Sequence, residues 1–166
     1  MLNSIPGRKI VYSFSMPSLG ALEAIAQRKA GDVSAWVCDG GPFLDLVRCT
    51  WNLFEHEYKI QSKILRGLYT GISYVLFGAG AEADVERCAK SLPLDFPILS
   101  IRGEKDPLVP PAAIDAVFAY AGRANVERLY FIDGGHLDGL KSFPTEYSAK
   151  LAQFIRAHSR PVRIGV

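Results

Sequence analysis

Three residues of this chain have the side chains that nucleophilic catalysis requires. Ser15, Asp106 and His136 each follow closely on a short apolar segment rich in β-branched and aromatic residues. A serine hydroxyl becomes a good nucleophile when a histidine takes its proton, and a carboxylate can orient that histidine and stabilise its cation. The three residues are therefore a candidate relay, with Ser15 as nucleophile, His136 as base and Asp106 as acid.

Each of the three also has a simpler explanation. Ser15 stands before an apolar helical run, where serine is a common helix cap. Asp106 precedes a proline, and Asp-Pro readily starts a turn. His136 follows two glycines in a polar loop. Neighbouring residues offer weaker alternatives: two serines as nucleophile and two carboxylates as acid, namely Ser13, Ser18, Glu104 and Asp39.

The elements that must position these residues alternate along the chain. Strands are predicted over residues 9–14, 33–39, 97–103 and 126–135, from their β-branched and aromatic content. Helices are predicted over residues 18–30, 110–123 and 145–158, with Gly31 as a stop signal and Thr145 as a cap. Such alternation favours an α/β fold: a mostly parallel sheet of about four strands with helices on both faces.

Ligands of an open parallel sheet bind beyond the carboxyl ends of its strands, which is where the three candidate residues fall. Residues 43–92, between the second and third strands, are longer than a crossover helix needs. We expect this segment to form a helical excursion over one edge or end of the sheet. Its aromatic residues could line an acyl pocket or pack among themselves, and Trp51, Phe54 and Tyr58 are the candidate substrate-binding residues.

Three segments of the sequence resemble the α/β-hydrolases. "VYSFSMPSLG" is similar to the family's nucleophile elbow, "PILSIRGEKDPLVP" to the strand and loop of its acid, and "LYFIDGGHLDGL" to the loop of its histidine. The resemblance implies a Ser15–Asp106–His136 triad, in the family's chain order, with the Met16 N–H as an oxyanion donor. It also implies that residues 43–92 are a cap.

The sequence departs from the family pattern in two ways. The elbow usually reads Gly-x-Ser-x-Gly, whereas Ser13 and Pro17 stand at the glycine positions here. Family members also carry four or more strands before the elbow, and one loop among them supplies the second oxyanion N–H. Only fourteen residues precede Ser15. The strand at 9–14 would then be a sheet edge open to a second copy or a partner chain.

These patterns predict one domain, residues 1–166, made of an elbow part (1–42), a cap-like part (43–92) and an acid and histidine part (93–166). The predicted function is a serine hydrolase for an ester or similar acyl bond. Esterase, thioesterase, amidase and carbon–carbon hydrolase all remain open, because one fold hosts many reactions. The alternative is a hydrolase-derived half domain that serves as an oligomerisation or binding module without turnover.

Composition excludes several other classes. The 166 residues carry a net charge of +2 and no basic stripe with interleaved aromatics, so we expect no nucleic-acid partner. Three cysteines without CxxC spacing argue against a disulfide framework or a structural zinc site. No metal or nucleotide motif is present and the proposed chemistry needs no cofactor. No leader or membrane-spanning segment is recognisable, which predicts a cytoplasmic protein acting on a small-molecule acyl substrate.

Overall fold

Four parallel strands form a single sheet in a computed structural model that describes residues 8–159. The strands are β1 (Lys9–Phe14), β2 (Val33–Asp39), β3 (Pro97–Gly103) and β4 (Asn125–Phe131), and they lie side by side in chain order. The predicted parallel α/β sheet is confirmed, with β4 ending earlier than expected because a turn follows Phe131. Residues 1–7, on which the expectation of no leader rests, lie outside the described residues.

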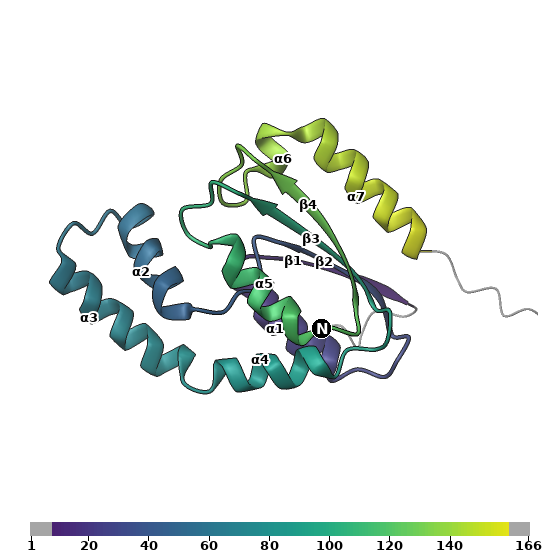
Figure 1. Cartoon of the computed structure of the whole chain (residues 1–166), viewed down its shortest axis with the longest axis horizontal. Coiled ribbons are helices and arrows are strands. Elements are labelled where there is room, and N and C mark those ends of the chain that lie inside the picture. The colour runs from purple at the N-terminus through teal and green to yellow at the C-terminus, as the bar shows by residue number, and fades with distance from the viewer. Residues whose placement is uncertain (1–7, 160–166) are drawn as a thin grey trace, which may run out of the picture.

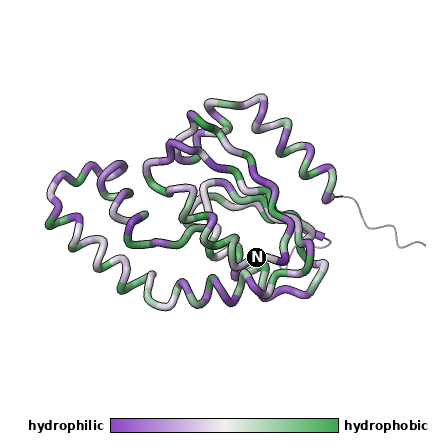
Figure 2. Tube along the Cα trace, in the orientation of Figure 1, coloured by the Kyte–Doolittle hydropathy of each residue, from purple (hydrophilic) through white to green (hydrophobic). Residues whose placement is uncertain are grey.

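Helices cover both faces of the sheet (Figure 1). On one face lie α1 (Pro17–Ala26), α4 (Ala81–Lys90) and α5 (Pro111–Tyr120), which share an apolar core with Trp36, Cys38 and Ile98. On the other, α7 (Pro144–His158) packs Tyr147 and Phe154 over Val37 and Leu99, beside the single-turn α6 (Gly139–Ser142). With both faces covered, β2 is buried along its whole length, and the sheet is predominantly hydrophobic in Figure 2.

All three predicted helices have other bounds than expected, and α5 ends at Tyr120, before residue 123. The first helix begins at Pro17 and ends at Ala26, so it stops well before Gly31. The last helix begins at Pro144 and not at a Thr145 cap; its N-cap position is Phe143, which makes no side-chain cap bond. In both helices proline occupies the first turn, where its missing N–H costs nothing and its fixed φ suits the helix.

The long segment at residues 43–92 divides between two roles. Helices α2 (Leu46–His56) and α3 (Lys63–Ser73), followed by the π-helical turn η2 (Tyr74–Gly78), form an arm beside the sheet (Figure 1). The chain then returns through α4, which packs between α1 and α5 as an ordinary crossover helix. The helical excursion is therefore confirmed for the first three elements, whereas α4 belongs to the layer that covers the sheet. Among the described residues, no helix is long and apolar enough to cross a membrane.

Strand β1 forms one edge of this sheet. The N–H groups of Lys9 and Ser15 donate to Asp32 O and Asp39 O, so the odd-numbered residues turn their backbone groups toward β2. By the alternation of a strand, Ile10, Tyr12 and Phe14 turn theirs outward. Within the described residues, these outward groups have no strand beside them.

Candidate active site

Ser15 lies in the tight turn between β1 and α1, in a strained backbone conformation. Its φ is +46°, which non-glycine residues rarely adopt. The turn is fixed on both sides, because the Ser15 N–H donates to Asp39 O at 2.7 Å and Ser15 O accepts from the Ser18 N–H at 3.0 Å. Strain that the surroundings hold in place is typical of functional sites, and it distinguishes Ser15 from an ordinary capping serine. Met16 and not Ser15 is the N-cap residue of α1.

Neighbouring small residues make room for this turn. A side chain at Gly41 would meet Ser15 O closer than any real Cβ contact, so only glycine fits there. Ser13 and Ser18, the weaker nucleophile candidates, are buried in a structural network instead. Ser13 Oγ donates to Ser18 Oγ at 3.0 Å and accepts from Trp36 Nε1 at 2.8 Å.

The structure brings Ser15, His136 and Asp106 together although they are far apart in the chain. His136 Nε2 lies 2.9 Å from Ser15 Oγ, and His136 Nδ1 lies 2.6 Å from Asp106 Oδ2. The carboxylate selects the tautomer that carries its proton on Nδ1, which leaves Nε2 free to accept from the serine hydroxyl. Both the imidazole and the carboxylate are largely buried, with 14% and 3% of their side-chain surfaces exposed.

The loops after β3 and β4 hold the acid and the base. Asp106 Oδ1 accepts from the N–H groups of Leu108 and Val109, at 2.8 and 2.9 Å, so its other oxygen is aimed at His136. The two loops touch where Gly103 passes the backbone of Gly134, with no room for a side chain at Gly103. Glycine at this crossing allows the close approach of the two loops.

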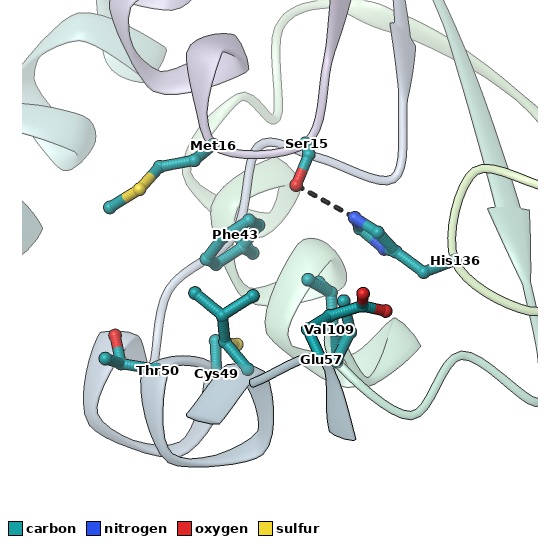
Figure 3. A pocket seen from close by; sticks show the side chains of 10 residues that line it. Ser15, Met16, Phe43, Cys49, Thr50, Glu57, Val109 and His136 are labelled. Atoms are coloured by element: carbon teal, nitrogen blue, oxygen red, sulfur yellow. Dashed lines mark hydrogen bonds between the residues drawn. The ribbon is translucent and has the colours of Figure 1, made fainter. Parts of the chain in front are cut away.

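A cavity of about 360 Å³ opens directly beside Ser15 and His136 (Figure 3). Most of its wall is apolar and comes from the elbow, the start of the arm and the loop after β3. The lining residues besides Ser15 and His136 are Met16, Phe43, Cys49, Thr50, Leu53, Glu57, Leu108 and Val109. Burial, together with the nearby Asp45 and Asp106 carboxylates, raises the pKa of Cys49 to about 12, so this thiol stays neutral. The cavity therefore places the Ser15 hydroxyl, hydrogen-bonded to His136, in an apolar space.

The predicted substrate-binding aromatics are not part of this cavity wall. Cys49, Leu53 and Glu57 lie four residues apart and share the face of α2 that meets the cavity. Trp51, Phe54 and Tyr58 belong to other faces of the same segment. The Trp51 ring lies under the Arg66 guanidinium, and the Phe54 ring packs between those of Tyr58 and Tyr69. These aromatics pack within the arm, which is the simpler of the two expectations. The residues that do line the cavity, Cys49, Leu53 and Glu57, follow an i, i+4, i+8 pattern, and this pattern in the sequence could have identified them.

Asp39, one of the alternative acids, forms a separate buried network next to the relay. Its Oδ2 accepts from the Tyr147 hydroxyl at 2.7 Å, and that hydroxyl also bonds to the Tyr12 hydroxyl. Burial raises the pKa of Asp39, partly against the hydrogen bond from Tyr147. The network links β1, β2 and α7. Glu104, the other alternative acid, is exposed and takes no part in the relay.

Within residues 8–159, no cluster of three or more His, Cys, Asp or Glu side chains could hold a metal ion. The two carboxylates around His136 serve its loop. Asp138 Oδ1 accepts from the Gly135 N–H at 2.9 Å, and Asp133 pairs with Lys105 at 2.6 Å. The remaining two histidines lie elsewhere, His56 at the end of α2 and His158 against the Phe154 ring.

Several known structures with a similar fold are hydrolases, although the two sequence comparisons find no match. No protein-family model and no curated protein sequence matches the chain. An esterase of Pyrococcus furiosus is 21% identical with a TM-score of 0.70, over 91% of this chain and 54% of the esterase. A serine hydrolase involved in carbazole degradation (14% identity, TM-score 0.57) matches over 94% of this chain and 67% of its own. The acylaminoacyl peptidase of Pyrococcus horikoshii (14%, TM-score 0.59) matches over 95% of this chain and 25% of its own.

The chain thus spans about half the length of the Pyrococcus esterase. At these identities the comparison concerns the fold alone, which here is a four-stranded parallel sheet flanked by helices. The described residues therefore have an α/β-hydrolase fold.

Proposed function

We propose that this chain carries the catalytic centre of a serine hydrolase that cleaves esters of small to medium apolar acyl groups. The observation that carries the proposal is the continuous hydrogen-bonded path from Ser15 through His136 to Asp106, at the wall of an apolar cavity. Helix capping or turn formation would not require a serine, a histidine and a carboxylate to lie within hydrogen-bond distance of one another. The fold of the structural neighbours supports the same reaction class.

The reaction follows from the roles of the three side chains. Ser15 Oγ attacks the ester carbonyl as its proton passes to His136 Nε2, and Asp106 stabilises the resulting imidazolium. The tetrahedral oxyanion accepts from the Met16 N–H, and no described residue accepts a hydrogen bond from this N–H. The imidazolium protonates the departing alcohol, and the acyl group remains on Ser15. His136 then deprotonates a water that releases the acid and restores the serine.

The cavity limits the substrate. Its volume lies near the lower end of the range for small-molecule sites, about 300–1,000 Å³. Met16, Phe43 and Leu53 give it apolar walls, and Glu57 is the only acidic residue that lines it within residues 8–159. An uncharged acyl chain of a few carbons fits this environment, whereas a carboxylate on the acyl group would be repelled by Glu57 and would lose hydration against the apolar walls.

The direct test is labelling with a fluorophosphonate, which phosphonylates an activated serine with loss of fluoride. Intact mass should show one adduct on the parent chain and none on Ser15→Ala or His136→Ala. Ser18→Ala is the matched control, because this serine lies close by without touching His136. A p-nitrophenyl ester series from acetate to decanoate then measures chain-length preference. A folded parent that takes no adduct and cleaves no ester would refute the proposal.

The edge strand β1, which has no further strand beside it within residues 8–159, favours a second candidate, an assembly module without turnover. Edge strands normally carry charged residues, prolines or bulges that prevent pairing. Strand β1 has a charged residue, Lys9, and an irregular register with β2 at its first position only. Residues 10–14, "IVYSF", carry no charge and no proline, and Tyr12 and Phe14 are more than a third exposed. A second copy or a partner chain could add a strand there. Ester turnover that depends on Ser15 would exclude this candidate.

A further inference from the structure

Helix α3 is oriented in the opposite sense to a normal surface helix. An amphipathic helix usually buries its apolar face and exposes its polar one. In α3, however, the two buried residues are polar: Arg66 and Thr70 are 4% and 5% exposed. Its large apolar residues are the exposed ones, and Ile64, Leu68 and Ile72 are 85%, 56% and 47% exposed.

Contacts with α2 account for the buried polar face. The Arg66 guanidinium lies 4.5 Å from the Trp51 ring centre and pairs with the Glu55 carboxylate. These contacts do not satisfy the whole face, because Arg66 Nε and Thr70 Oγ1 are buried without a hydrogen-bond partner among the described residues. Turning the helix over would bury the apolar face instead. Retention of the inverted orientation is therefore expected only if something covers the apolar face.

The exposed apolar face is large and continues through η2. Val75, Leu76 and Phe77 are each two-thirds or more exposed, directly after the α3 residues. Figure 2 shows hydrophobic residues recurring along this stretch of the arm. Together these side chains present on the order of 500 Å² of apolar surface, which is comparable to the largest patch of a typical monomer. A standard interface buries roughly 800 Å² per partner, so this apolar surface alone would supply more than half of one.

This face combines large apolar side chains with two glycines. Gly67 and Gly71 line a shallow, open groove together with the neighbouring apolar residues Leu68, Ile72, Val75 and Leu76. One helix therefore provides both a ridge of large side chains and a gap where a second backbone can come close. A two-fold axis would place the ridge of each copy in the groove of the other, which is the isologous arrangement of most homodimers.

Charge also favours a second copy over other partners. Residues 67–80 contain no acidic and no basic side chain, so two copies of this face would not repel each other. An acidic peptide, a nucleic acid or an anionic lipid surface would need basic side chains along the patch. The two basic residues of α3 are Lys63, at its first position, and Arg66, which is buried against α2. We propose that the face formed by α3 and η2 pairs with the same face of a second copy of this chain.

The proposal is tested by the mass of the full chain in sedimentation equilibrium, from 1 to 100 µM. We expect a dimer in the parent and at least a tenfold weaker dimer in Ile72→Glu. A second variant, Gly71→Glu, closes the groove; a side chain there meets nothing within the chain, so the monomer should fold normally. The controls place a glutamate at equally open positions elsewhere, in Leu94→Glu and Gly20→Glu, and should remain dimeric.

Three results would overturn the proposal. The first is a parent chain that is monomeric up to 100 µM, and the second is that both arm variants remain dimeric. In the latter case Phe14→Lys tests the β1 edge, and dissociation of that variant would assign the interface to the edge. A monomer that floats with phosphatidylcholine vesicles, and no longer does so as Ile72→Glu, would assign the face to a lipid surface. None of these readouts depends on ester turnover, so the proposed reaction stands or falls separately.

Discussion

Gly41 offers a sensitive test of how the strained turn at Ser15 activates the nucleophile. A methyl group at this position would meet the Ser15 carbonyl oxygen well inside the 3.0 Å that real Cβ contacts essentially never cross, and it would also touch Ser18 Cβ at 3.1 Å. Both neighbours belong to backbone or to the first turn of α1, so neither can swing away. We therefore expect Gly41→Ala to push the whole turn aside by roughly 0.5 Å or more, because a close-packed interior transmits the strain.

That displacement acts on the reacting atoms. Ser15 Oγ is 2.9 Å from His136 Nε2, and the same shift lengthens or bends this hydrogen bond. A misplacement of about 1 Å can cost about 100-fold in rate. For Gly41→Ala we expect kcat/KM for p-nitrophenyl butyrate to fall by about 10- to 100-fold, with the loss mainly in kcat because the cavity walls are unchanged.

The assay is the rate of fluorophosphonate labelling alongside ester turnover, with circular dichroism as the check on folding. Gly20→Ala is the matched control, since a side chain there meets nothing within 4 Å. It should keep full activity and gain about 0.5–1 kcal/mol of stability from the better helix propensity of alanine. A folded Gly41→Ala protein that labels at the parent rate would refute the argument that this contact holds Ser15 in place.

Four further substitutions test the site. Asp106→Asn should lower kcat by about 10⁴-fold. The side-chain oxygen of the introduced asparagine would keep the hydrogen bonds from the Leu108 and Val109 N–H groups, so its NH₂ group would face His136 and favour the wrong imidazole tautomer. Equal pH–rate profiles for variant and parent would contradict this. Tyr147→Phe removes the hydrogen-bond donor to the buried Asp39 carboxylate and should lower the free energy of unfolding, measured in urea, by about 1–3 kcal/mol. An unchanged urea midpoint would show that the hydroxyl is not needed. Burial raises the pKa of Asp39 above its ordinary 3.8, so the folded state binds the proton more tightly and loses stability as the pH rises through that range. Asp39→Asn should therefore melt higher than the parent at pH 7, with the gain vanishing at pH 3, and a gain that is constant with pH would refute the assignment. Leu53→Trp fills the cavity and should lower kcat/KM for octanoate esters about tenfold more than for acetate, whereas equal losses would place the acyl group elsewhere.

The sequence predicted the sheet and the relay because both depend on local patterns. Runs of β-branched residues bounded by glycine and proline mark strands wherever they occur, and alternation with helices implies parallel pairing. Parallel strands bring their carboxyl ends to one edge, so Ser15, Asp106 and His136 were expected to meet there. Their hydrogen-bonded geometry agrees with that expectation.

Which residues of α2 line the cavity was decided only by the tertiary structure. Both the Trp51 face and the Cys49 face of α2 have helical spacing, and the sequence alone does not say which one turns toward the serine. The answer lies in how α2 packs on α3, where the Arg66 guanidinium stacks on Trp51 and holds that face away from the cavity. The orientation of α3 is a stronger case, because periodicity predicts which residues share a face but assumes that the apolar face is the buried one. What lies against a helix decides its orientation, and that information is not contained in the helix itself.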